Sequence, residues 1–124
     1  MPARLRPADP ATVAAARSRF DAARAASTSA DKADLRLLTK HYLALLETRA
    51  PGRSVEVRVP PYAAVQVVEG VRHTRGTPPA VVEMEAETWI ALATGTLGWP
   101  EAADSARVRA SGERADLTPY LPLG

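Results

Sequence analysis

Cysteine is absent from this 124-residue chain, which excludes disulfide bonds and thiol chemistry and suits a reducing compartment. Histidine occurs twice, as His41 and His73, and the two positions lie far apart in the sequence. This spacing indicates neither a zinc site nor a catalytic centre. The chain has one phenylalanine and two tryptophans, and alanine supplies much of its 46% apolar residues, so we expect a lean core.

Long apolar runs are also missing, and none approaches the roughly 18 residues that a membrane helix needs. The N-terminal residues include charged side chains where a secretory signal would be apolar. We therefore expect a cytoplasmic protein with no transmembrane segment. Nucleophile-elbow, phosphate-loop and dinucleotide fingerprints are absent too, which favours a non-enzymatic protein with no cofactor and no metal.

Lysine is scarce, and arginine supplies most of the positive charge. Residues 1–62 hold eleven basic and six acidic side chains, whereas residues 63–124 hold five basic and eight acidic ones. This asymmetry fits either an anionic partner or a solvated basic helix face. Aromatic residues do not alternate with the basic ones, so we predict no nucleic-acid binding. We interpret one basic set on two predicted helices as solvated, namely Arg17, Arg24, Arg36 and Lys40.

The N-terminal part predicts two helices over residues 10–49. Asp9 and Pro10 suit the cap and the first position of a helix that runs to about residue 26. Residues 31–49 give a stronger signal, because apolar residues at i, i+3, i+7, i+10 and i+11 form one stripe. That stripe consists of Leu35, Leu38, Tyr42, Leu45 and Leu46.

The remaining residues predict short elements. Residues 54–85 contain three alternating segments, and their close succession favours antiparallel strands. Residues 86–106 predict two short helices, and residues 107–123 predict a last strand followed by a proline-rich tail. This element order predicts a single α+β domain over residues 1–124.

Residues 88–112 carry a motif. They run Thr-Trp-Ile-Ala-Leu-Ala-Thr-Gly-Thr-Leu, then a short predicted helix, then Ser-Ala-Arg-Val-Arg-Ala-Ser-Gly. This resembles the closing half of sterol carrier protein domains, in which a helix ends in Leu-Ala-x-Gly-x-Leu and a later strand runs from a Ser-Gly pair to a second glycine. Ala106 stands where that family usually has the first of these glycines. The matching positions are Leu92, Ala93, Gly95, Leu97, Ser105, Val108 and Gly112.

Over about residues 35–123 the chain also resembles a compact actinobacterial group of sterol carrier protein orthologs. The resemblance implies a mostly antiparallel five-stranded sheet covered by helices, with a tunnel for a fatty acyl chain or a sterol. We expect such a lipid-like ligand to contact a set of apolar side chains, unless those side chains simply form the core. The set is Met84, Trp89, Leu92, Leu97 and Trp99.

A basic loop offers a second candidate site. Arg72, His73 and Arg75 lie within four residues, beside Gly76, and could hold a phosphate or a carboxylate. The alternative is a solvated hairpin loop. The leading hypothesis is a non-catalytic sterol-carrier-like protein for a small amphipathic ligand. The alternative hypothesis is an adaptor without a lipid cavity, whose basic loop binds an acidic protein or an anionic, phosphorylated metabolite. A relative of the sterol-carrier-like domains that are fused to thiol-dependent enzymes is a third.

Overall fold

A computed structural model describes residues 5–70, 80–112 and 115–124 of the protein. Two long helices begin the fold, α1 (Pro10–Ala25) and α2 (Lys32–Arg49). An aspartate caps each helix, because the side chains of Asp9 and Asp31 accept hydrogen bonds from first-turn amides at 3.1 and 2.8 Å. Both helices lie where the sequence predicts them, since capping residues and an apolar stripe are local signals.

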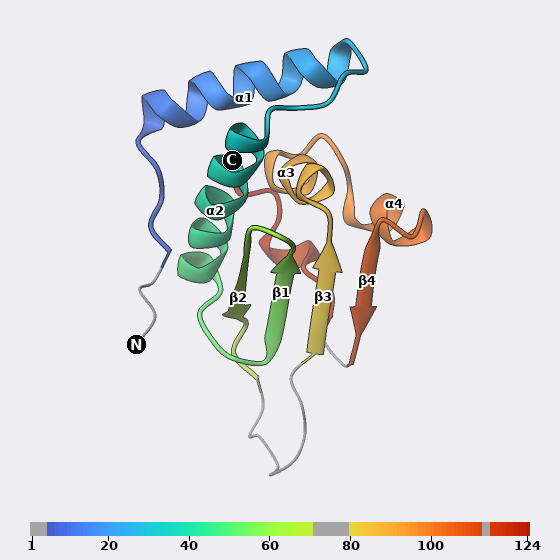
Figure 1. The fold of residues 1–124 in the computed structure, drawn as a ribbon. Helices are drawn as coiled ribbons and strands as arrows, with labels where there is room; N and C mark the ends of the chain where they lie inside the picture. The colour runs from blue at the N-terminus through green and yellow to red at the C-terminus, as the bar shows by residue number, and fades with distance from the viewer. Residues whose placement is uncertain (1–4, 71–79, 113–114) are drawn as a thin grey trace.

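In the described part of the chain, four strands form one mixed sheet in the order β2-β1-β3-β4. The pairs β1–β2 and β3–β4 are antiparallel, whereas β1 and β3 are parallel. In Figure 1 the arrows of β1 and β3 therefore point the same way. The strands are β1 (Val55–Val59), β2 (Ala63–Val67), β3 (Ala80–Met84) and β4 (Val108–Ser111).

The predicted number of five strands is wrong for the described residues, which form four, and the sheet is mixed because one of its three strand pairs is parallel. The prediction placed β3 beside β2, because consecutive strands usually pair. Instead β3 pairs with the far edge of β1, in the register Val55 with Ala80 and Val57 with Val82. The chain between Val67 and Ala80 is long enough to reach past β1, and strand spacing in the sequence does not report which edge a strand joins.

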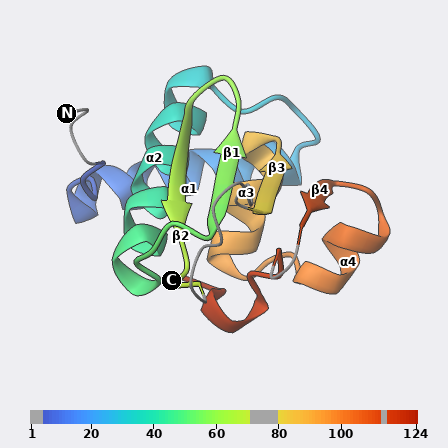
Figure 2. The same cartoon turned by 90° about the horizontal axis from the view of Figure 1, so that it is seen from below.

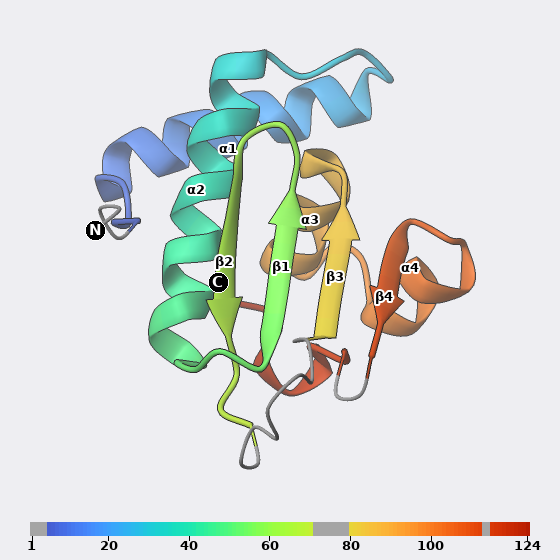
Figure 3. The same cartoon turned by 60° about the horizontal axis from the view of Figure 1, so that its bottom comes forward.

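Helices cover one face of the sheet, and none of the helices in the described part of the chain lies over the other face, as Figures 1 and 3 show. Side chains of β1 alternate accordingly, since its three valines are fully buried while Arg58 between them is exposed. Two short helices follow β3, α3 (Ala86–Thr94) and α4 (Trp99–Asp104), and α4 lies beside β4. Figure 2 shows α2 and α3 side by side beneath the sheet.

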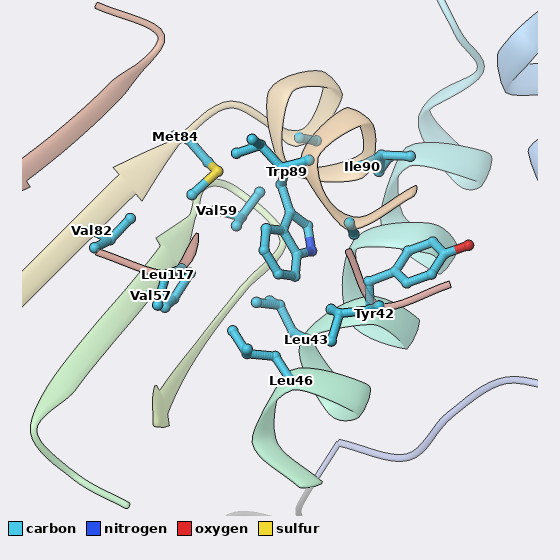
Figure 4. Close-up of a cluster of buried hydrophobic side chains, with 14 of the residues drawn as sticks. Tyr42, Leu43, Leu46, Val57, Val59, Val82, Met84, Trp89, Ile90 and Leu117 are labelled. Atoms are coloured by element: carbon cyan, nitrogen blue, oxygen red, sulfur yellow. The ribbon is translucent and has the colours of Figure 1, made fainter. Parts of the chain in front are cut away.

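Trp89 on α3 fills the space between the sheet and α2 (Figure 4). Its side chain is 0% exposed, and its indole nitrogen donates a hydrogen bond to the backbone oxygen of Thr39 at 3.3 Å. A buried indole N–H needs a hydrogen-bond acceptor, and this bond supplies one. The same bond also fixes the orientation of the ring. Buried side chains from α2, β1, β3, α3 and the C-terminal tail form the core together with Trp89. They are Tyr42, Leu43, Leu46, Val57, Val59, Val82, Met84, Ile90 and Leu117.

The C-terminal tail, residues 115–124, returns to the helices and includes one 3-10 turn, η1 (Thr118–Tyr120). The guanidinium of Arg49 donates to the backbone oxygens of Tyr120 and Pro122 at 3.1 and 2.7 Å. The amide of Leu123 donates to the backbone oxygen of Ala93 at 2.7 Å. These bonds tie the tail to the C-terminal ends of α2, through the Arg49 side chain, and of α3, where an unpaired helix carbonyl accepts the amide of Leu123.

An ion pair joins α1 to α2. The guanidinium of Arg19 binds both carboxylate oxygens of Asp34, with distances of 2.9 and 2.8 Å. The Asp34 side chain is 9% exposed and that of Arg19 is 60% exposed. The hydrogen bond and charge of Arg19 lower the pKa of Asp34, although burial of the carboxylate opposes that shift.

We predict that Asp34 makes folding sensitive to acid. A carboxyl group with a lowered pKa in the folded state stabilises the protein above its unfolded pKa of about 3.9, and this contribution disappears as the pH falls through the folded value. The variant Asp34→Asn should therefore be less stable than the wild type at pH 7, and the difference should shrink below about pH 4. Urea unfolding at several pH values measures it, and a difference independent of pH would contradict the prediction.

We also predict that Arg49 holds the tail in place. Replacing it with glutamine removes two charge-assisted hydrogen bonds, so hydrogen exchange at the Leu123 amide should become about five- to tenfold faster. Exchange at core amides of β1 should not change. Arg53→Gln is the matched control, because Arg53 is also exposed and no hydrogen bond or ion pair of its side chain occurs among the described residues. Equal exchange in both variants would refute the role of Arg49.

Candidate functional site

A pocket of about 280 Å³ lies where the end of α3, the start of α4 and the C-terminal tail meet. It is called the C-terminal pocket below. Segments far apart in the sequence form its walls, because the tail returns to α3 after β4. The residues that line it are Leu92, Gly95, Leu97, Gly98, Trp99, Pro100, Thr118, Leu121 and Pro122.

Gly95 shapes the inner wall of this pocket. It ends α3 in the left-handed conformation, with φ at +85°, and the amide of Thr96 then donates to the backbone oxygen of Ala91 at 3.0 Å. A Cβ atom at Gly95 would lie 3.4 Å from the Cβ of Pro122. That distance is an ordinary van der Waals contact, so the left-handed turn and not the approach of the tail requires glycine, and the turn directs Leu97 back toward the pocket.

The C-terminal pocket is uncharged. No acidic or basic side chain lines it, and its polar side-chain groups are the hydroxyl of Thr118 and the indole N–H of Trp99. Such a lining suits the burial of an apolar group with one or two hydrogen bonds for orientation. It offers no proton donor or acceptor that titrates near neutral pH. Across the described residues, moreover, no three histidine, aspartate or glutamate side chains gather to hold a metal ion.

The structure divides the predicted apolar residues into two groups. Leu92, Leu97 and Trp99 line the C-terminal pocket, although Leu92 and Leu97 are only 1% and 7% exposed and also belong to the core, and Trp99 is the more exposed of the two tryptophans. Met84 and Trp89 are 2% and 0% exposed and lie in the core, where they pack between the sheet and the helices. Sequence patterns could not separate the groups, because an apolar side chain on a short helix looks the same whether it faces a core or a pocket.

The predicted anion site, Arg72, His73 and Arg75, lies outside the described residues. The tail also lines the C-terminal pocket, through Thr118, Leu121 and Pro122, which the sequence motifs did not indicate. The alternation of Leu121 and Leu123 in an extended segment was the available signal, since it is typical of a chain with one buried side.

Ala106, which stands at a position where sterol carrier protein domains usually have glycine, has an unusual backbone conformation. It has φ at +59° in the turn between α4 and β4, where the amide of Arg107 donates to the backbone oxygen of Ala102 at 2.9 Å. This left-handed conformation favours glycine, which is the residue that sterol carrier domains usually have there. Ala106 therefore adopts a conformation that an alanine fits less well than a glycine.

Within residues 5–70, 80–112 and 115–124, none of the helices combines the length and apolarity that crossing a bilayer requires.

No curated protein matches the chain. A family model described as bacterial SCP ortholog, where SCP denotes sterol carrier protein, matches residues 31–123. The matched segment contains α2, the whole described sheet and every residue that lines the C-terminal pocket, and it leaves out α1. Because the match covers three quarters of the sequence, the chain belongs to the bacterial SCP ortholog family, which is sterol carrier protein-like.

Proposed function

We propose that the protein is a non-catalytic carrier that holds the apolar end of a small amphipathic ligand in the C-terminal pocket. One observation carries the proposal. An uncharged pocket of about 280 Å³ is walled by apolar side chains and glycines at the end of α3. Membership of a sterol carrier protein-like family supports a carrier role for that pocket.

The size of the pocket limits the ligand. Pockets for small molecules usually enclose about 300–1,000 Å³, so this one suits a short chain or the end of a longer one. Each methylene group that leaves water contributes about 0.8 kcal/mol, and affinity should therefore depend on chain length. Trp99 and Thr118 would orient the ligand at its polar end, because their polar groups are the ones that the lining supplies.

The lining also favours binding over catalysis. General acid–base chemistry needs a titratable side chain within hydrogen-bonding reach of the reacting atoms. The lining of the C-terminal pocket contains no such side chain. The hypothesis that Arg72, His73 and Arg75 bind an acidic head group remains a proposal, and the apolar contacts do not depend on it.

We predict that filling the pocket abolishes binding. Gly98 has ordinary backbone angles, and a Cβ added there would have its nearest neighbour, the Cδ of Pro100, at 3.9 Å. Gly98→Phe should therefore insert a ring without backbone strain and weaken the binding of 1-octanol by at least about tenfold. Gly98→Ala is the control, since one methyl group leaves most of the volume open. The fluorescence of Trp99 reports binding, and Trp99→Phe identifies the part of the signal that comes from Trp89.

The alkanol series from hexanol to octanol completes the test. Affinity for the wild type should rise by up to about fourfold for each methylene until the pocket is full. Equal octanol binding by the wild type and Gly98→Phe, with unchanged thermal stability, would contradict a ligand site in the C-terminal pocket.

A further inference from the structure

A second pocket, of about 550 Å³, lies between the N-terminal half of α2 and the segment that precedes α1. It is called the N-terminal pocket below. Figure 1 shows the N-terminal segment running beside α2, and Tyr62 from the turn between β1 and β2 adds a further wall. The lining residues are Arg6, Ala8, Lys32, Ala33, Arg36, Leu37, Lys40, His41 and Tyr62, none of which lines the C-terminal pocket.

Positive charge is concentrated around this pocket. Lys32, Arg36 and Lys40 follow one another at intervals of four residues, so they lie along one face of α2, and Arg6 approaches from the N-terminal segment. No carboxylate belongs to the lining. The ion pairs found among the described residues use Arg19, Arg58 and Arg109 instead. Like charges at this spacing repel one another, and an anion in the pocket would relieve that repulsion.

The pocket also has an apolar wall. Ala8, Ala33, Leu37 and the ring of Tyr62 supply carbon atoms among the cationic groups. Leu37 is partly exposed although it belongs to the helix that contributes most to the core, and it lies off the main apolar stripe. The long stems of the lysines and arginines extend such apolar surface toward the charged ends.

His41 fixes the wall opposite α2. Its Nδ1 atom accepts a hydrogen bond from the amide of Ala8 at 2.9 Å, which ties the N-terminal segment to the helix. Burial lowers the pKa of His41, so the ring is neutral at pH 7 and keeps this acceptor. The wall that contains Arg6 and Ala8 is therefore held in place before any ligand binds.

We infer that the N-terminal pocket binds a small amphipathic anion, a single apolar chain that ends in a carboxylate or phosphate group. The cationic groups at the pocket match the ionised head group, and Leu37 with Tyr62 matches the chain. The volume of about 550 Å³ lies within the range of about 300–1,000 Å³ that is usual for ligand pockets. The site goes beyond the proposed carrier function, because Arg6 and Ala8 precede the segment that matches the family.

The test uses octanoate as the probe and ¹⁵N-labelled full chain, with amide chemical shifts as the readout. Octanoate should shift the amides of Arg6, Ala8 and residues 32–41. The affinity measured from these shifts should be at least about fivefold lower for 1-octanol, which has the same chain length without the charge. Arg36→Gln should weaken octanoate binding by about three- to fivefold, since an exposed ion pair contributes modestly. Arg53→Gln removes the same charge from an exposed position outside the pocket and should leave the affinity unchanged.

A second pair of variants tests the apolar wall. Leu37→Gln should weaken octanoate binding by about tenfold. Leu45→Gln is its matched control, because Leu45 is also partly exposed on α2 but does not line the pocket. Should Leu37→Gln fail to fold, Arg36→Gln decides the question alone, since its side chain is exposed.

The outcomes separate this site from the C-terminal pocket. Octanoate shifts that are confined to Gly95, Gly98 and the Trp99 indole would overturn the N-terminal site and leave the carrier proposal intact. Binding to phosphatidylglycerol vesicles without any response to free octanoate would also overturn it, since the occupant would then be a membrane surface. Amide shifts at Arg6, Ala8 and residues 32–41 that need more octanoate in Arg36→Gln would support it even if Gly98→Phe still bound 1-octanol.

Discussion

The burial of Trp89 between the sheet and α2 is the contact on which the rest of the structure depends. The ring comes from α3, rests against side chains of β1 and β3, and donates its N–H to the backbone of α2. One residue thus fixes the distance between three elements. Among the described residues, the buried apolar side chains form a hydrophobic cluster that includes Trp89 and draws on the helices, the sheet and the tail. The position of α3 decides where its last turn lies, and with it the inner wall of the C-terminal pocket.

The tail depends on the same arrangement. The Arg49 side chain at the end of α2 donates to the backbone oxygens of Tyr120 and Pro122, and the backbone oxygen of Ala93 near the end of α3 accepts from the amide of Leu123. The Ala93 oxygen belongs to the last turn of α3, whose carbonyls lack partners within the helix. A proline-rich segment suits this task, because it has little conformational freedom to lose when it docks. The short tail therefore forms one wall of the C-terminal pocket with only a single 3-10 turn and no α-helix of its own.

The two pockets differ in chemistry. The C-terminal pocket has an uncharged lining that is contained within the segment typical of the family. The N-terminal pocket has four cationic side chains, and part of its wall precedes that segment. An apolar group binds best where water is excluded, whereas cationic side chains lose their hydration in such an enclosure. Separate pockets therefore allow one surface to exclude water and the other to keep its charges hydrated.

Local chemistry in the sequence determined the elements themselves. The aspartates at positions 9 and 31 fix where the first two helices begin, the alternating valines of residues 55–59 fix a strand with one buried face, and Gly95 fixes the end of α3. These signals act over a few residues, through capping bonds and side-chain periodicity, so the sequence shows them directly.

Tertiary structure alone decided how the elements meet. The pairing of β3 with β1 depends on which edge of the sheet the chain reaches. The alternation of apolar and polar residues in a strand is the same on either edge, so it does not indicate the partner. Arg36 and Lys40 resemble an ordinary solvated helix face until Arg6, Ala8 and Tyr62 are placed opposite them. A pocket is a relation between segments that are distant in the sequence, and only packing of the core sets that relation.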